Sequence, residues 1–214
     1  MVFHVLNRGV GRMRIFDSDG DYAAFERILE ETVENQPMRI CAYCLMPNHW
    51  HLVLWPESDG DLAAFMHRLT NTHVQRWQQQ KHLVGTGHVY QGRYKSFPVE
   101  TDEYFYRVVR YVERNALRAN LVQQAEEWRW SSLWRGINGT RKNKALLSTW
   151  PIVKPLQWRR LVNQPQTDTE LAALRRCVVR GQPYGSDRWV ARITKKLGIE
   201  STIHPRGRPK KKRP

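Results

Sequence analysis

The first 122 residues alternate between short apolar stretches and longer stretches with helical periodicity. Apolar side chains spaced three or four residues apart predict amphipathic helices over 21–35, 61–80 and 102–119. Strands are predicted at 3–7, 38–46, 49–55 and within 89–99. The order β-α-β-β-α-β-α predicts an α+β fold of the ferredoxin-like (RRM-like) kind, a four-stranded antiparallel sheet with helices on one face.

Beyond residue 122 the pattern becomes looser. We expect residues 128–132 to pack back onto the preceding domain and residues 136–144 to form an exposed basic loop. Two short helices are predicted at 169–181 and 187–198. The last residues, 203–214, form a basic tail rich in Pro and Gly that we expect to be disordered when unbound.

The net charge of +15 is concentrated at one end of the chain. Residues 1–130 carry 15 Lys/Arg and 16 Asp/Glu, a net of −1, whereas residues 131–214 carry 20 Lys/Arg and 4 Asp/Glu, a net of +16. A one-sided basic surplus is typical of proteins that bind a polyanion. The chain shows no basic amphipathic helix with a bulky apolar face, so nucleic acid is favoured over an anionic membrane as the partner.

Composition places the chain among ordinary soluble proteins, with 41% hydrophobic and 26% charged residues. No apolar run is long enough to span a membrane, and the start lacks the features of a secretory signal. Three cysteines do not form a disulfide framework. Cys41 and Cys44 match C-x-x-C, but residues three apart on a strand should face opposite ways, which favours buried packing over a metal or redox role. We expect a cytoplasmic, nucleoid-associated protein.

The motif His49-Trp50-His51 lies on a predicted strand. Residues two apart on a strand face the same way, so both imidazoles should leave one face of the sheet and could share a metal. Trp50 should then point into the opposite face. By itself the motif also fits two surface histidines on a half-buried strand.

The predicted helix over 102–119 has one apolar and one unusual polar face. The polar face carries Tyr104, Arg107, Tyr111, Asn115 and Arg118. A partly buried aromatic flanked by solvated arginines is the alternative explanation.

Together the strand and the helix suggest a mechanism. A phenol has a pKa of about 10 and is a poor nucleophile near neutral pH, so its attack on a phosphodiester needs a cation to stabilise negative charge. His49, His51 and Asn115 could supply three metal ligands. The guanidinium groups of Arg107, Arg114 and Arg118 could hold flanking phosphates. The product would be a covalent phosphotyrosine, which preserves the bond energy for rejoining without a nucleotide cofactor.

Four segments in order resemble the REP-associated tyrosine transposases of the HUH superfamily. They are Cys44-Leu-Met-Pro-Asn-His-Trp-His-Leu-Val53, Gln91-Gly-Arg-Tyr-Lys95, Tyr111-Val-Glu-Arg-Asn115 with Arg118, and Trp130-Ser-Ser132. The resemblance covers about residues 1–134. It implies a metal site at His49 and His51 with Asn115 as third ligand, Tyr111 as nucleophile, Mg²⁺ or Mn²⁺ as cofactor, and single-stranded or hairpin (REP palindrome) DNA as substrate, cleaved through a 5′-phosphotyrosine.

On this basis we predict three parts: a catalytic domain over 1–134, a basic helical DNA-binding extension over 135–202, and an AT-hook-like tail over 203–214. Imidazole ligands ordinarily suit transition metals, so Mn²⁺ fits the mixed ligand set better than Mg²⁺. Relatives occur as dimers and as monomers, which leaves a homodimer open. The resemblance favours Tyr111 over Tyr104, which shares the polar face.

Two further segments are candidate DNA contacts. Arg93, Tyr94 and Lys95 place an aromatic ring between two cations, which suits stacked bases and phosphates, although ordinary strand-edge residues would look the same. Arg206 and Arg208 belong to Pro205-Arg-Gly-Arg-Pro209, which resembles the AT-hook that binds a narrow A·T minor groove. A nonspecific polybasic tail is the alternative.

Two other functions remain open at this point. A sequence-specific DNA-binding regulator on the same fold would have lost cleavage or show it only incidentally. A zinc hydrolase built on His49-Trp50-His51 is the third reading, disfavoured because no further ligand cluster follows His51.

Overall fold

The four strands form one antiparallel sheet in the order β2-β3-β1-β4. The computed structural model describes residues 1–204. The strands are β1 (Val2–Arg8), β2 (Arg39–Met46), β3 (His49–Trp55) and β4 (Lys95–Val99). The α+β class and the four-stranded antiparallel sheet are therefore confirmed. β3 and β1 lie in the centre, so a residue on either of them is flanked by strands on both sides.

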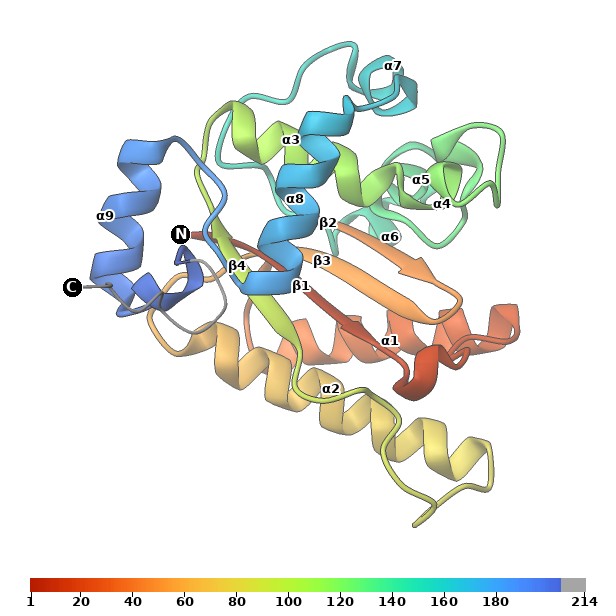
Figure 1. The fold of residues 1–214 in the computed structure, drawn as a ribbon. Coiled ribbons are helices and arrows are strands. Elements are labelled where there is room, and N and C mark those ends of the chain that lie inside the picture. Colours follow the sequence, from red (N-terminus) through yellow and green to blue (C-terminus); the bar gives the residue numbers. More distant parts are fainter. Residues whose placement is uncertain (205–214) are drawn as a thin grey trace, which may run out of the picture.

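One face of the sheet is covered by α1 (Asp19–Asn35) and α2 (Asp61–Gln80) (Figure 1). α1 begins at a capping box, in which the Ser18 hydroxyl accepts from the Asp21 amide and the Asp21 carboxylate accepts from the Ser18 amide. Fully buried side chains from both helices pack against those of the sheet. They include Phe25, Leu29, Phe65 and Leu69 from the helices, and Trp50, Leu52 and Leu54 from β3.

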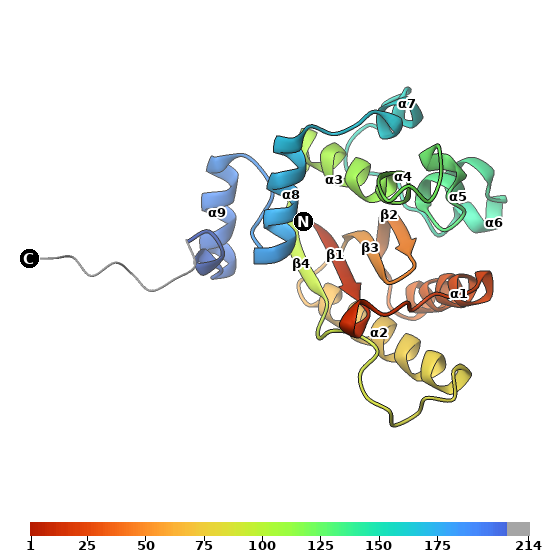
Figure 2. The same cartoon turned by 45° about the vertical axis from the view of Figure 1, so that its right-hand side comes forward.

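A third helix, α3 (Glu103–Glu113), covers the opposite face, as Figures 1 and 2 show from two directions. The expectation of helices on one face therefore holds only for α1 and α2. The physical reason is that β2 and β3 bury side chains on both faces, and a sheet that is apolar on both faces needs a layer on each. The predicted apolar stripe of α3 forms this second core, with Phe105, Val108, Val109 and Val112 fully buried.

The helix predicted over 102–119 is interrupted once, at Arg114. A short helix, α4 (Asn115–Arg118), follows directly. The Arg114 amide still donates to the Arg110 carbonyl at 2.9 Å, and the Arg118 amide donates to the Arg114 carbonyl at 2.9 Å. Helical spacing therefore continues through the interruption, and residues 111 and 115 stay about one turn apart.

The C-terminal part is mostly helical, as predicted. It comprises α5 (Ser132–Asn138), α6 (Arg141–Lys144), α7 (Trp158–Asn163), α8 (Asp168–Arg180) and α9 (Asp187–Leu197). A short 3₁₀ segment, Glu200–Thr202, follows α9, and two others lie earlier in the chain, at Val10–Arg12 and Ala125–Glu127. The two helices predicted at 169–181 and 187–198 are confirmed by α8 and α9. The loop predicted at 136–144 is wrong, because the Thr140 side chain accepts from the Asn143 amide and begins α6. No helix within residues 1–204 is both long and apolar enough to cross a bilayer.

The hydrophobic core continues across the predicted domain boundary at residue 134. Trp158, Val162, Leu174 and Cys177 are buried in the same cluster as the apolar face of α3. Arg135, with 2% of its side chain exposed, forms ion pairs with α1 at Glu26 (3.2 Å) and Glu30 (2.7 Å). Helices α7 and α8 therefore cover α3, and Arg135 ties the start of the C-terminal part to α1, whatever their separate role in binding.

The two cysteines of the C-x-x-C motif face the same core, contrary to the expectation of opposite faces. A β-bulge shifts the pairing of β2 between Ile40 and Ala42, so Cys41 and Cys44 both join the cluster on the α3 side. Both thiols are free and buried, and the Cys44 thiol donates to the sulfur of Met46 at 3.8 Å. The prediction of buried packing is therefore confirmed, but both thiols face one core because of the β-bulge, which strand alternation does not predict.

Candidate functional site

His49 and His51 lie on the face of β3 that α3 covers. Their rings are 5.0 Å apart between centroids and nearly perpendicular, at 85°. Trp50 points into the other core, where its indole N–H donates to the Tyr90 hydroxyl at 2.9 Å. The expected alternation along this strand is therefore confirmed, and the two imidazoles share one face.

Each imidazole has a hydrogen-bond partner at Nδ1. His49 Nδ1 lies 2.6 Å from Oδ1 of Asn48, in the turn before the strand. His51 Nδ1 lies 2.9 Å from Nε2 of His4, on the neighbouring strand β1. The Asn48 carbonyl oxygen can only accept, so His49 carries its proton on Nδ1 and presents a lone pair at Nε2.

Burial keeps these imidazoles neutral. Burial, followed by the nearby guanidinium groups of Arg8 and Arg118, lowers the pKa of His49 to about 3. The pKa of His51 is lowered well below its ordinary value, mainly by burial and also by the neighbouring histidines. Because only the neutral ring binds a metal, both side chains are in the form that ligation requires at neutral pH.

The Tyr111 ring packs directly against this histidine cluster. Its centroid lies 5.9 Å from that of His51 and 6.1 Å from that of His4, edge to face in both cases. Tyr111 is 8% exposed, which leaves it at the border between core and solvent. Tyr104 is placed elsewhere, against Tyr184 at 5.1 Å. Of the two tyrosines on the polar face of the predicted helix, Tyr111 is the one beside the histidines.

Arg118 and Asn115 complete this side of the site. The Arg118 guanidinium lies over the Tyr111 ring, 4.1 Å from its centroid, and donates from Nη2 to Asn115 Oδ1 at 2.7 Å. Asn115 is 5% exposed, and its Nδ2 is buried without a hydrogen-bond partner within residues 1–204. The predicted nucleophile, third ligand and one predicted arginine are thus brought together next to the histidines.

The donor set fits a divalent cation that takes mixed nitrogen and oxygen ligands. His49 Nε2 is available, and Asn115 can offer an amide oxygen that already faces a positive charge. Residues 1–204 contain no group of three or more His, Cys, Asp or Glu side chains arranged to hold a metal. His4 does not supply a third metal ligand beside His49 and His51, because its Nε2 is hydrogen-bonded to His51. A cation here therefore needs amide or phosphate oxygen to complete its shell.

Arg8 and Asn48 are functional candidates that the sequence did not reveal. Arg8 is paired with His49 across β1 and β3, and its charge acts on both His49 and His51. Its Nε is buried without a partner within the described residues. The position of Asn48 directly before the His-x-His motif was the available signal, whereas the position of Arg8 depends on strand pairing.

Arg93 and Tyr94 line a groove between α2 and the segment before β4. The groove has a volume of about 1020 Å³, and its described lining carries no carboxylate. Neutral amide and hydroxyl side chains line it as well: Asn7, Thr70, Asn71, Gln75, Gln78 and Gln91. Tyr94 is half-buried, which raises its pKa, while Arg93 and Lys95 are exposed. Their role as DNA contacts stays a prediction.

Arg107 and Arg114 instead bind the C-terminal part of the chain. Arg107 pairs with Glu103 at 2.9 Å and with Glu170 of α8 at 3.6 Å. Arg114 donates to the carbonyl of Asn163 at 3.0 Å. Both arginines therefore hold α7 and α8 against α3, contrary to their predicted role in holding flanking phosphates. Arg206 and Arg208 lie outside the described residues.

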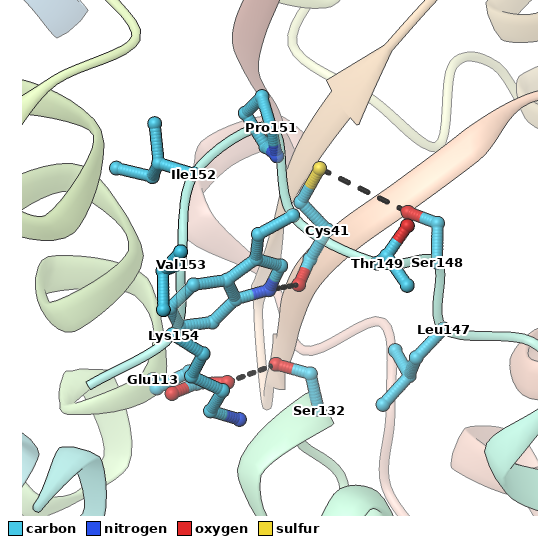
Figure 3. Close-up of a pocket in the computed structure, with 11 residues that line it drawn as sticks. Cys41, Glu113, Ser132, Leu147, Ser148, Thr149, Pro151, Ile152, Val153 and Lys154 are labelled. Carbon is cyan, nitrogen blue, oxygen red and sulfur yellow. Dashed lines mark hydrogen bonds between the residues drawn. The ribbon is translucent and has the colours of Figure 1, made fainter. Parts of the chain in front are cut away.

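A second pocket, of about 570 Å³, lies under residues 147–154 (Figure 3). The carboxylate of Glu113 is buried there and accepts from Ser132 and from the Trp158 indole, each at 2.6 Å. Burial raises the pKa of Glu113. Among the described residues, no histidine or tyrosine lines this pocket, so it is separate from the histidine cluster. The hydrogen bond from Trp158 makes Glu113 a link between α3 and α7.

Comparison with solved structures agrees with this architecture. A REP-associated tyrosine transposase bound to a REP hairpin aligns with a TM-score of 0.53 and 15% identity, covering 78% of this chain and 92% of that one. A putative transposase from Deinococcus radiodurans R1 aligns with a TM-score of 0.40 and 17% identity, covering 53% of this chain and 88% of that one. The first similarity shows a shared fold. No curated protein matches the chain.

A protein-family model described as "Transposase IS200 like" matches residues 1–115, more than half of the chain. The matched segment contains the whole sheet, the His49-Trp50-His51 motif, Tyr111 and Asn115. The chain belongs to the IS200-like transposase family.

Proposed function

We propose that this protein is a metal-dependent DNA strand transferase that cleaves and rejoins single-stranded or hairpin DNA through Tyr111. The observation that carries the proposal is the packing of the Tyr111 ring against His51 at 5.9 Å, with the Arg118 guanidinium on the ring. A phosphate placed there would meet a nucleophile and a positive charge together. All of these groups belong to one chain, so the proposed site is complete without a partner, and a homodimer stays a prediction.

In the proposed step, Tyr111 Oη attacks phosphorus while the bond from phosphorus to the 3′ oxygen breaks. The products are a 5′-phosphotyrosine and a free 3′-hydroxyl, which can attack in reverse to rejoin the strand. Arg118 stabilises the negative charge that develops on the phosphate oxygens. Arg8, paired with His49 across β1 and β3, would supply a second positive charge for the same phosphate.

His49, His51 and Asn115 would hold the divalent cation, Mg²⁺ or Mn²⁺, with DNA phosphate oxygen completing the shell. The cation supplies Lewis-acid polarisation of the phosphate and orients the leaving group. Neutral imidazoles and an amide oxygen form a mixed donor set that suits Mn²⁺ better than Mg²⁺. Asn115 reaches the cation only if Oδ1 is shared with, or released by, Arg118.

The groove beside α2, on the other face of the sheet from the histidine pair, is proposed to hold unpaired bases of the substrate. Side-chain amides form paired hydrogen bonds to base edges, and Tyr94 offers a ring for stacking. Arg93 and Lys95 would contact the backbone phosphates. The surplus positive charge of residues 131–214, including Arg206 and Arg208, would add affinity that does not depend on sequence.

The test is covalent capture of a 3′-labelled hairpin oligonucleotide, because a 5′-phosphotyrosine retains the fragment on the 3′ side of the cut. We expect the wild-type chain with Mn²⁺ to form an adduct that resists denaturation, and Tyr111→Phe to form none while binding the same hairpin. Tyr104→Phe is the matched control and should form the adduct normally. Chelation should abolish the adduct while leaving the thermal midpoint nearly unchanged. An adduct that persists in Tyr111→Phe would refute the assignment.

A sequence-specific regulator is the alternative that the Arg118–Asn115 hydrogen bond favours, because it occupies an oxygen needed for metal binding. Tight hairpin binding without an adduct in Mg²⁺ or Mn²⁺ would support that alternative. The absence of a three-residue ligand group within residues 1–204 gives no support to a zinc hydrolase.

A further inference from the structure

We propose that His4 is a positioning residue for the metal site, accepting a hydrogen bond from His51 so that Nε2 of His51 is left to bind the cation. The inference rests on the proposed function and assigns a role to a residue outside the His49-Trp50-His51 motif. His4 lies on β1, next to β3, and points to the same side of the sheet as the histidine pair.

His4 makes one polar side-chain contact within residues 1–204. Its Nε2 lies 2.9 Å from Nδ1 of His51, and the two rings stack at 5.0 Å with an angle of 10°. Its other nitrogen, Nδ1, is buried without a partner, and the residue is fully buried. The Phe97 ring meets it edge to face at 4.9 Å. Its polarity is therefore directed at His51 alone.

Packing does not explain a histidine at this position. Burying a polar ring with an unsatisfied nitrogen costs free energy that an apolar side chain of similar size would not cost. The surrounding residues Val2, Val53 and Phe97 would accommodate an aromatic hydrocarbon. Packing therefore does not account for His4, whereas its hydrogen bond to His51, a proposed metal ligand, does.

The hydrogen bond can exist in two neutral forms. In one, His51 donates from Nδ1 and keeps a lone pair on Nε2, as a ligand must. In the other, His4 donates from Nε2, and His51 carries its proton on Nε2, where it blocks ligation. Both forms leave Nδ1 of His4 unsatisfied, so this penalty does not favour either. Binding of a cation selects the first.

His49 shows the same arrangement with a different partner. Its Nδ1 is held by the Asn48 carbonyl oxygen at 2.6 Å, which fixes the proton on Nδ1. Both proposed ligands thus have Nδ1 hydrogen-bonded to a neighbouring side chain, and Nε2 of His51 is left for a cation in the first of the two forms. Such outer contacts orient a metal-bound imidazole and raise its basicity, and their loss typically weakens metal affinity about 10- to 100-fold.

The experiment compares Mn²⁺ binding by full-length variants, measured from free Mn²⁺ in electron paramagnetic resonance titrations with and without a hairpin oligonucleotide. His4→Phe keeps a ring but has no acceptor, and we expect its affinity to fall about 10- to 100-fold. His4→Gln restores an acceptor oxygen and should recover most of the affinity. Thermal unfolding should show His4→Phe to be as stable as the wild type.

A second measurement reports the tautomer directly and does not require a variant to fold. In the wild-type chain labelled with ¹⁵N-histidine, long-range proton–nitrogen spectra should place the His51 proton on Nδ1 when diamagnetic Mg²⁺ and hairpin are bound. A proton on Nε2 would overturn the role of His4. So would equal Mn²⁺ affinity in His4→Phe and wild type, or equally poor affinity in folded His4→Gln and His4→Phe. If the wild type forms the Tyr111 adduct and binds Mn²⁺, those results reject His4 alone; if it binds no Mn²⁺ and forms no adduct, the proposed function itself fails.

Discussion

Arg118 donates a hydrogen bond to Oδ1 of Asn115 at 2.7 Å, so a guanidinium occupies the amide oxygen that a metal would use. The same guanidinium covers the Tyr111 ring and donates to the Tyr111 carbonyl at 3.4 Å. Its pKa is lowered, mainly by burial. The proposed nucleophile and the proposed third ligand are therefore both held by the Arg118 guanidinium, which would have to be shared with or released to an arriving phosphate.

Arg118→Ala should separate metal binding from strand cleavage. Removing the guanidinium frees Asn115 Oδ1 and removes a like charge from the metal site, so Mn²⁺ affinity should be unchanged or higher. The stabilisation of phosphate charge is lost, and we expect adduct formation to slow about 100-fold, as for other preorganised charge-stabilising donors. Rates of adduct formation and Mn²⁺ titrations check both parts.

The control for this prediction is Arg76→Ala, which removes a cation from α2 that pairs with Glu31 on the other side of the sheet. Its adduct rate should match that of the wild type. Weaker Mn²⁺ binding together with a normal rate in Arg118→Ala would contradict the role given to Arg118.

Tyr94→Ala and Lys95→Ala should weaken hairpin binding in different ways. Loss of base stacking on Tyr94 should cost about 1–3 kcal/mol when the hairpin carries unpaired flanking bases, and little when it is blunt. Lys95→Ala should weaken both substrates alike and reduce the slope of log affinity against log salt by about one. Fluorescence anisotropy at several salt concentrations measures both effects. Equal loss on both hairpins in Tyr94→Ala would argue against stacking.

A chain truncated after residue 134, at the predicted domain boundary, should be far less stable than the whole protein. It loses Arg135, so Glu26, which is 3% exposed, keeps only the Tyr43 hydroxyl at 2.5 Å and the Arg129 guanidinium at 3.4 Å. Breaking a buried ion pair costs about 3–5 kcal/mol. The truncation also uncovers α3 by removing Trp158 and α8.

Urea denaturation of the truncated chain checks this expectation. The matched control is a chain ending at residue 204, which keeps every described contact and should match the full protein. Arg135→Ala in the full chain isolates the contribution of the ion pair. A 1–134 fragment as stable as the whole chain would contradict this prediction and show that residues 1–134 fold as an independent domain.

Acid should destabilise the fold because its buried histidines resist protonation. Burial lowers the pKa of His73 from its ordinary 6.5 to about 3, and His73 Nδ1 lies 2.6 Å from the Tyr90 hydroxyl. The unfolded chain takes up the proton near pH 6.5 and the folded chain does not, so stability is highest above pH 6.5 and falls as pH drops toward 3. The loss is about 1.4 kcal/mol per pH unit for each such histidine.

Urea denaturation at pH 7 and pH 5 measures this loss. His73→Gln, which lies away from the proposed metal site, should lose less stability between those pH values than the wild type does. A free energy of unfolding that does not change between pH 7 and pH 5 would contradict the neutral, buried state of these histidines.

The sequence by itself determined the order of elements and singled out the groups that we propose to react. Strand alternation put His49 and His51 on one face, and helical spacing put Tyr111 and Asn115 on one face, because both periods are local properties of the backbone. The one-sided charge indicated a polyanionic partner without reference to the fold. These inferences need no knowledge of which element lies beside which.

Only the tertiary structure decided which residues meet across elements. The first predicted strand allowed His4 to lie near the histidine pair, but only the pairing of β1 with β3 brought His4 to His51 and Arg8 to His49. From the helical face alone, Arg107 and Arg114 were predicted to bind DNA phosphates. In the structure they bind Glu170 and the Asn163 carbonyl of the C-terminal part. Strand register and long-range packing depend on contacts between distant residues, and local periodicity carries no information about such contacts.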